Sequence, residues 1–232
     1  MRKNLRNLLI GVSAMIALGT LSACSSGSST EATSSASSTA PATATPFPQS
    51  ARYMADMEKD GKKMAIGISV DGDNVTAYAC NGVDDEAWFF GNQTKGAIDI
   101  TGKFRDTLNA SFTGSNVKGD LTMNGVAYDF TAAPVSAPAG MYTASLDGAR
   151  ASWIVHPDGT VTGVQINGGP TGRDFEQAEL QQLNTAQFQT QIRNKRVLLQ
   201  ANQSIKLTNG TLTSKINGKD VTGALVTGNT RF

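Results

Sequence analysis

The sequence predicts a mainly β protein, an antiparallel meander that forms a barrel or a sandwich, with one helix in its C-terminal third. Three observations lead to this prediction. Short runs of alternating apolar and polar residues recur from about residue 52 onward. Asn-Gly and Asp-Gly dipeptides separate many of these runs, and such dipeptides accept the positive φ angles of tight hairpin turns. After Gly168-Gly169-Pro170 the alternation gives way to helical spacing.

Residues 1–23 have the three-part pattern of a signal peptide. Arg2, Lys3 and Arg6 give a basic start, and an uncharged apolar run extends from Leu8 to Leu18. This run is too short for a lasting transmembrane helix. The leader therefore predicts export.

The leader ends in Leu21-Ser22-Ala23-Cys24, which resembles the lipobox of bacterial lipoproteins. In that family the cysteine receives a diacylglycerol and the signal peptide is cleaved just before it. The resemblance implies lipidation of Cys24 and a membrane as partner, because two or more acyl chains anchor a protein durably. Ser25 follows the cysteine, which implies the outer membrane in a two-membrane bacterium; otherwise the outer face of the cell membrane is expected. The alternative is an ordinary secretory signal with a chance cysteine.

Residues 24–50 are expected to form a disordered tether after the lipidated cysteine. The stretch consists almost entirely of Ser, Thr, Ala and Pro, and Glu31 is its one charged residue. No periodic apolar face is available for burial, so the segment has no reason to fold.

Residues 51–170 are expected to form one antiparallel β domain. Turns are predicted at Asp71-Gly72, Asn81-Gly82, Asn124-Gly125, Asp147-Gly148 and Asp158-Gly159. The expected strands are Met64–Val70, Val75–Asn81, Ala87–Gly91, Ala97–Thr101, Leu108–Thr113, Val117–Met123, Val126–Thr131, Met141–Leu146, Arg150–Val155 and Thr160–Gln165.

Residues 171–232 are expected to hold one helix followed by strands. Asp174 is placed to cap the helix, with Gln177 completing a capping box. This segment either completes the barrel or forms a small second lobe. The apolar residues of the helix are Phe175, Ala178, Leu180 and Leu183, and the expected strands are Ser204–Leu207, Thr211–Ile216 and Val221–Val226.

The composition argues against several functional classes. The chain has 20 Lys and Arg against 19 Asp and Glu, and loss of the basic leader leaves a slight acidic excess. Nucleic acid is therefore not an expected partner. With one His and two Cys, a zinc site of the usual ligands cannot be built within one chain, and no metal or cofactor is expected. No serine-hydrolase, dinucleotide or P-loop motif is present.

Cys80 is the one thiol outside the lipobox, and His156 is the one histidine. A nucleophilic cysteine needs a histidine base close by. Nothing in the spacing brings these two residues together, so we expect a structural thiol and a turn histidine. Because Cys80 has no partner cysteine in the folded part, no intrachain disulfide is expected in the mature protein.

Three polar stretches are further candidates. Asp71-Gly72-Asp73-Asn74 resembles the start of a calcium loop, but Val75 stands where an oxygen ligand is needed, so a hairpin turn is favoured. Asp84, Asp85 and Glu86 offer carboxylates for hydrolysis. The loop from Gly168 to Arg173 could hold a phosphate, although a plain connecting loop fits better.

Ala77-Tyr78-Ala79-Cys80-Asn81-Gly82, with Glu86-Ala87-Trp88 and Phe130-Thr131-Ala132, is similar to uncharacterised exported proteins of actinobacteria. This resemblance brings no assigned activity. We therefore expect a non-catalytic envelope lipoprotein whose β domain binds an envelope protein, the cell wall or a lipid. The alternatives are a carrier of lipid or apolar ligands inside a barrel, and an envelope hydrolase that uses Asp84, Asp85 or Glu86. The sequence selects no catalytic or ligand-binding residue.

Overall fold

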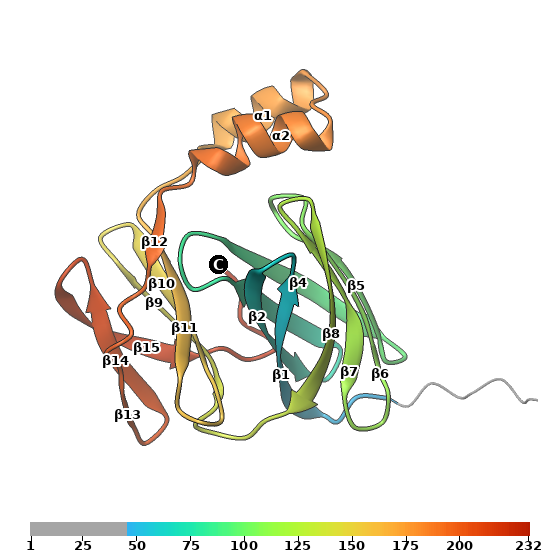
Figure 1. The fold of residues 1–232 in the computed structure, drawn as a ribbon, viewed down its shortest axis with the longest axis vertical. Coiled ribbons are helices and arrows are strands. Elements are labelled where there is room, and N and C mark those ends of the chain that lie inside the picture. Colours follow the sequence, from blue (N-terminus) through green and yellow to red (C-terminus); the bar gives the residue numbers. More distant parts are fainter. Residues whose placement is uncertain (1–45) are drawn as a thin grey trace, which may run out of the picture. The chain divides into compact units, whose positions relative to one another are not determined.

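The computed structural model describes residues 46–232. This part of the chain is mainly β and contains a closed eight-stranded antiparallel barrel and a second, seven-stranded curled sheet (Figure 1). The expected signal peptide, Cys24 and the tether up to residue 45 lie outside the described residues. The mainly β prediction is confirmed, and the barrel is one of the two expected architectures.

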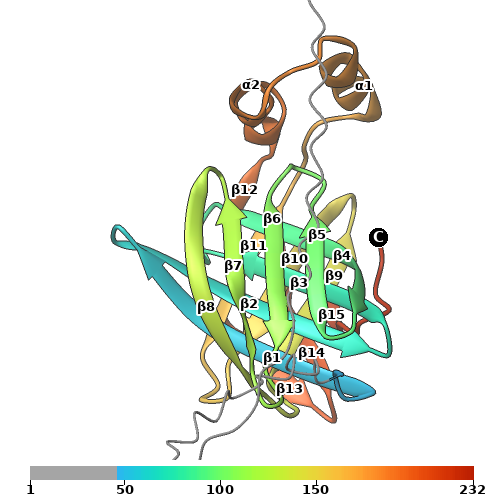
Figure 2. The ribbon, with the colours of Figure 1, turned by 90° about the vertical axis from the view of Figure 1, so that its right-hand side faces the viewer.

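The barrel is formed by consecutive strands that pair with their neighbours in chain order (Figure 2). It closes where the first strand pairs with the eighth, with Tyr53 opposite Pro134 and Met54 opposite Ala133. Its strands are β1 (Ser50–Lys59), β2 (Lys62–Asp71), β3 (Asn74–Cys80), β4 (Glu86–Thr94), β5 (Ala97–Thr101), β6 (Thr107–Phe112), β7 (Val117–Met123) and β8 (Val126–Pro134).

The second sheet has the strand order β12-β11-β10-β9-β15-β14-β13, and all neighbours are antiparallel. Trp153 and Tyr142 lie in the core on one of its faces. Its strands are β9 (Gly140–Leu146), β10 (Ala149–Val155), β11 (Val161–Ile166), β12 (Leu198–Gln200), β13 (Lys206–Thr208), β14 (Thr211–Ile216) and β15 (Lys219–Leu225).

Asx-Gly turns close several of the hairpins, as the sequence predicts. Asn124 and Gly125 have φ angles of 49° and 76°, and Asp147 and Gly148 have 52° and 80°. Positive φ at both central residues matches the right-handed twist of the paired strands. Asp60-Gly61 makes the same kind of turn between β1 and β2.

The barrel interior is filled by alternate side chains of all eight strands. In β5 to β8 the buried positions alternate with exposed or half-buried ones, so these strands bury mainly their inner face. The larger members of this interior core are Tyr53, Ile66, Ile68, Phe89, Leu108, Leu121, Tyr128 and Phe130.

Strands β2 and β3 are buried on both faces, which distinguishes them from the rest of the barrel. Their inner residues face the barrel core, whereas Ala65, Tyr78 and Cys80 pack against Met141 and Ile154 of the second sheet. A strand covered on both sides is apolar along its whole length. The second sheet therefore rests on one outer face of the barrel.

Residues 226–232 fasten the same outer face. Ser69 Oγ donates to the Val226 carbonyl at 3.1 Å, and Thr76 Oγ1 donates to the Gly228 carbonyl at 3.1 Å. The Gly228 amide donates to Asp71 Oδ2 at 2.7 Å. This segment thus runs from the second sheet across the outer face of β2 and β3.

Two helices, rather than the one expected, lie between β11 and β12: α1 (Gly172–Leu180) and α2 (Thr185–Gln191). Gln182 has a φ of 50° and interrupts the helical path, and Asn184 with Gln187 forms a new capping box. The cap of α1 is Thr171, with Asp174 as its capping-box partner, so Asp174 is not the cap and Gln177 is not part of the box.

A 3₁₀ turn, η1 (Arg193–Lys195), follows α2. We call residues 167–197 the helical arm. Its small apolar core joins Ala178, Leu183, Phe188 and Ile192 to Phe104 of the β5–β6 loop. None of the helices within residues 46–232 has the length and apolar content needed to cross a membrane.

Several boundaries differ from the expected ones. Strand β1 was not expected, and Phe47, from the expected tether, is buried against Phe112 with ring centroids 4.8 Å apart. Phe47 is the one large apolar side chain in this polar stretch, and its burial is favourable although its neighbours in sequence are small and polar.

The chain passes from the barrel to the second sheet after Pro134. Residues 171–232 therefore neither complete the barrel nor form a lobe alone. The expected strand Ser204–Leu207 lies at Lys206–Thr208, and β12 was not expected.

Replacing Gly67 with Ala should lower the free energy of unfolding by about 1–3 kcal/mol. A Cβ there would lie 2.5 Å from Cγ of the buried Met141, which cannot move away freely between the barrel and the second sheet. Gly172→Ala is the control, because no atom lies within 4 Å of its Cβ position and alanine favours the helix. Urea unfolding measures both, and equal effects would contradict this packing.

Candidate functional site

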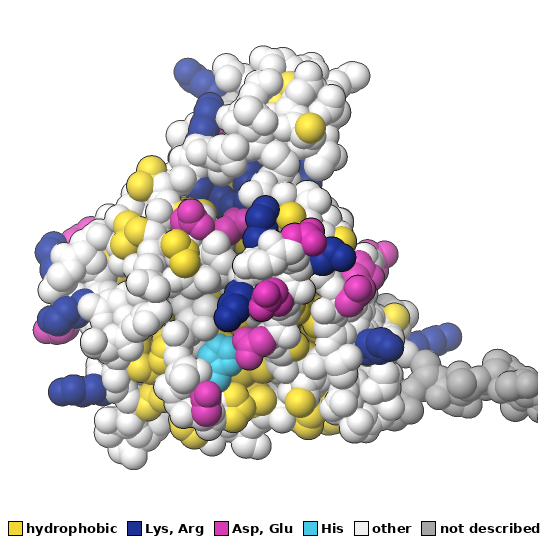
Figure 3. Space-filling view, in the orientation of Figure 1, with side chains coloured by type: hydrophobic (Ala, Val, Ile, Leu, Met, Phe, Trp, Pro, Cys, Tyr) yellow, Lys and Arg dark blue, Asp and Glu magenta, His cyan; other side chains and the backbone are white. Residues whose placement is uncertain are grey.

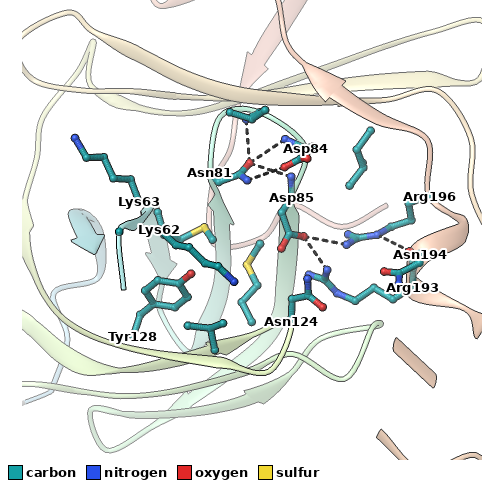
Figure 4. Close-up of a pocket in the computed structure, with 16 residues that line it drawn as sticks. Lys62, Lys63, Asn81, Asp84, Asp85, Asn124, Tyr128, Arg193, Asn194 and Arg196 are labelled. Atoms are coloured by element: carbon teal, nitrogen blue, oxygen red, sulfur yellow. Dashed lines mark hydrogen bonds and ion pairs between the residues drawn. The ribbon is translucent and has the colours of Figure 1, made fainter. Parts of the chain in front are cut away.

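A cavity of about 840 Å³ opens at one end of the barrel, and we call it the barrel mouth (Figure 4). Its volume lies in the range of ligand-binding pockets, which is roughly 300–1,000 Å³. Four parts of the chain line it: the β1–β2 turn, the β3–β4 loop, the β7–β8 turn and residues 193–198. The cavity therefore lies between the barrel rim and the helical arm.

The floor of the barrel mouth is the top of the barrel core. Met64, Met123 and Tyr128 belong to that core and also line the cavity. Burial raises the pKa of the Tyr128 phenol, so its hydroxyl stays protonated at neutral pH. The floor thus offers two thioethers and one phenol.

The side chains of Lys62 and Lys63 point in different directions (Figure 4), although the two residues are adjacent in β2. Side chains alternate along a strand, and Lys62 shares the inner side of β2 with Met64. Figure 4 shows the Lys62 ammonium reaching toward the middle of the cavity and the Lys63 ammonium directed away from it. Neither ammonium has a hydrogen-bond or ion-pair partner among residues 46–232.

Asn81 shapes the β3–β4 loop. Its Oδ1 accepts from the amides of Val83, Asp84 and Asp85 at 2.9, 3.0 and 2.9 Å, and its Nδ2 donates to Asp84 Oδ1 at 2.9 Å. Asparagine side chains commonly close loops in this way. The loop therefore presents Asp84 and Asp85 in fixed positions at the rim.

Asp85 is engaged by two arginines of the helical arm. Its Oδ1 lies 2.8 Å from Arg193 Nη1 and 3.2 Å from Arg196 Nη2. Arg193 also pairs with Asp106 at 3.3 Å, and both of these side chains are only 2% exposed. Figure 3 shows acidic and basic side chains gathered just below the helices.

The same group of charges continues toward the second sheet. Arg150 of β10 pairs with Glu86 at 2.9 Å, and Arg196 Nη1 donates to the Glu86 carbonyl at 2.6 Å. We call these side chains, together with those described above, the buried charge cluster: Asp85, Glu86, Asp106, Arg150, Arg193 and Arg196. It joins the barrel, the second sheet and the helical arm.

Burial in this cluster disfavours the charged form of the carboxyl groups. It raises the pKa of the Glu86 and Asp106 carboxyls, while the neighbouring arginines, chiefly Arg150 and Arg193 respectively, act in the opposite direction. The stability that these two groups contribute therefore decreases as pH rises from their ordinary pKa toward the raised one. The neighbouring arginines limit this loss of stability, because they lower the two pKa values that burial raises.

Cys80 and His156 are not joined by a hydrogen bond. Cys80 is fully buried between the barrel and the second sheet, and burial raises the pKa of its thiol to about 12. His156 Nε2 lies 3.1 Å from Thr162 Oγ1, and its Nδ1 lies 3.8 Å from Asp56. A protonated, inaccessible thiol is a poor nucleophile, as expected of a structural cysteine.

The other polar candidates lie in three places. Asp84 and Asp85 line the barrel mouth, whereas Glu86 lines a second cavity. The stretch from Gly168 to Arg173 leads into and begins α1, and its first residues line the same second cavity as Glu86. Asp71-Gly72-Asp73-Asn74 forms the β2–β3 turn, apart from both. Within residues 46–232 no group of three His, Cys, Asp or Glu side chains is arranged to hold a metal ion.

Sequence reasoning did not select Lys62, Tyr128, Arg193 or Arg196 as site residues. In the sequence, the two arginines are noticeable only as part of a basic stretch before Val197, and Lys62 only as a residue after the Asp60-Gly61 turn.

No family model, curated protein or solved structure shows a significant match to this chain.

Replacing Arg193 with Met should lower the free energy of unfolding by about 3–5 kcal/mol, because the buried Asp106 carboxylate would lose its ion-pair partner. Lys195→Met is the control on the same turn. Lys195 is 51% exposed and pairs with Asp174, and surface pairs contribute about 0–1 kcal/mol. Urea unfolding compares the two variants, and similar small losses in both would show that the cluster does not hold the arm.

Proposed function

We propose that this protein is a bacterial envelope lipoprotein, anchored through lipidated Cys24, whose β domain binds a ligand at the barrel mouth without catalysing a reaction. The basic start, apolar run and Leu21-Ser22-Ala23-Cys24 motif support the anchor. The β fold of residues 46–232 is compatible with a binding domain, and the Ser/Thr/Ala/Pro-rich stretch before it would be the tether that displays this domain from the membrane. The membrane that carries the anchor is proposed to be the outer membrane in a two-membrane bacterium, and otherwise the cell membrane, with the protein on its outer face.

The free ammonium of Lys62 over the floor of the barrel mouth is the observation that carries the binding proposal. Asp85 is paired with two arginines, whereas Asp84 accepts from the neutral amide of Asn81 and keeps its charge. The cavity is lined by more basic than acidic side chains, namely Lys62, Lys63, Arg193 and Arg196 against Asp84 and Asp85, so positive charge is in excess. A ligand with a carboxylate or phosphate group fits this arrangement, and carboxamides of Asn124 and Asn194 supply further hydrogen bonds.

Binding is favoured over the hydrolase and carrier alternatives for physical reasons. The Asp85 carboxylate is engaged by Arg193 and Arg196, and Asp84 is hydrogen-bonded to Asn81, so the contacts of both rim carboxylates are structural ones within the protein. Glu86, the third candidate, faces another cavity. An apolar cargo would need space inside the barrel, but the inward side chains of the eight strands form one contiguous core.

Replacing Cys24 with Ala in the full chain should move the protein from the membrane fraction to the soluble fraction, because the acyl chains would have no attachment site. Cys80→Ala is the matched control, since Cys80 lies in the folded domain. Fractionation at high salt, with detection of the protein, gives the result. A Cys24→Ala protein that stays with membranes would contradict the lipoprotein proposal.

Replacing Lys62 with Gln should weaken anion binding at the barrel mouth at least about tenfold, because a charge-assisted hydrogen bond would be lost. Lys63→Gln should change it less than about twofold, since the Lys63 ammonium is directed away. Titration of the protein with inorganic phosphate and with succinate, followed by the NMR signals of Asn124 and Tyr128, measures this. Binding that neither substitution alters, or the absence of binding, would contradict the proposed ligand class.

A further inference from the structure

A second cavity, of about 340 Å³, lies beside the barrel mouth, and we call it the Trp88 cavity. It is bounded by β4 of the barrel, the β5–β6 loop with Lys103 and Asp106, β10 of the second sheet and the loop that leads into α1. Glu86, Trp88 and Phe90 stand at alternate positions of β4, so they share its outer face. Arg196 lines both cavities, whereas Lys62 lines only the barrel mouth.

Three buried polar atoms of side chains that line the Trp88 cavity have no hydrogen-bond partner: Trp88 Nε1, Glu86 Oε2 and Arg150 Nε. The Glu86 side chain is only 3% exposed, and Trp88 is 8% exposed. Unpaired buried polar groups are rare in folded proteins because each costs free energy. Three of them belong to side chains that line one cavity, and together they comprise two donors and one acceptor.

Aromatic rings form the apolar wall of the cavity. The rings of Trp88 and Phe90 are nearly parallel, with centroids 5.6 Å apart and an interplanar angle of 8°. Phe232 meets both edge-on, at 4.8 and 5.1 Å. The Arg150 guanidinium lies 4.3 Å from the centroid of Phe232 and completes the end of the cavity next to Glu86.

From this arrangement we infer that the Trp88 cavity binds a neutral, hydroxyl-bearing ring of the monosaccharide class. Trp88 Nε1 and Arg150 Nε can only donate, and the Glu86 carboxylate, which is ion-paired with Arg150 at 2.9 Å, accepts. A ligand carboxylate could not donate to Glu86, and a ligand ammonium could not accept from Trp88 or Arg150. A hydroxyl does both, and the C–H face of a sugar ring packs on aromatic rings such as Trp88 and Phe90.

This inference is independent of anion binding at the barrel mouth, and it adds a second ligand class to the same domain. The two cavities are separated by the buried charge cluster, in which Asp85 faces one cavity and Glu86 the other. A Lys62→Gln protein should therefore bind sugars at the Trp88 cavity as well as the unsubstituted protein does.

The two tryptophans of the chain make the test specific. Trp153 Nε1 donates to the Asn202 carbonyl at 2.9 Å within the core of the second sheet, away from the cavity. In a ¹⁵N-labelled mature chain, titration with millimolar glucose, galactose or N-acetylglucosamine should shift the indole N–H signal of Trp88 and leave that of Trp153 in place. Glucuronate and glucosamine serve as charged counterparts and should shift it less.

Trp88→Phe should weaken sugar binding about fivefold, since it keeps an aromatic wall and removes one neutral hydrogen bond. In this variant, binding is followed by the backbone amide of Phe90, and the dispersed Trp153 signal reports that the protein is folded. If no neutral sugar moves the Trp88 signal, or if only a charged counterpart does, the inference is wrong. Equal shifts of Trp88 and Trp153 would also overturn it.

Discussion

The outer face of β2, β3 and β4 is the constraint on which the rest of this structure depends. A closed barrel satisfies its own backbone hydrogen bonds, and its inner side chains fill its interior. The apolar outer positions of these three strands still have to be removed from water. The second sheet covers them, Met141 packs where Gly67 leaves space, and residues 226–232 tie the two layers together.

Charged groups complete the assembly where the apolar contact ends. The helical arm has only a small core of its own, against Phe104, and is held further by Arg193 and Arg196 on Asp85 and Asp106. Buried ion pairs add little net stability compared with apolar contacts, because both charges lose their water. They do fix position, since each unpaired charge would be costly. The cluster therefore sets where the arm stands relative to the barrel rim.

This arrangement places both cavities at the edges of the packed layers. The barrel mouth lies where the arm leaves the end of the barrel partly open, and the Trp88 cavity lies where the second sheet diverges from β4. One presents a free ammonium over an apolar floor, and the other presents two donors and an acceptor beside aromatic rings. We propose recognition as the role of both cavities.

The sequence alone determined the mainly β class, the Asx-Gly turns and most strand positions, because alternation and positive-φ dipeptides are local properties. It also determined the expectation of a lipid anchor at Cys24. The break between α1 and α2 has a local signal too, the capping box of Asn184 and Gln187, which was not used in the prediction. The tertiary structure decided where the chain leaves the barrel and that Asp85 meets Arg193. These depend on contacts between residues far apart in the chain: alternation shows that a face is buried but not what covers it, and a surplus of charged residues does not show which of them pair.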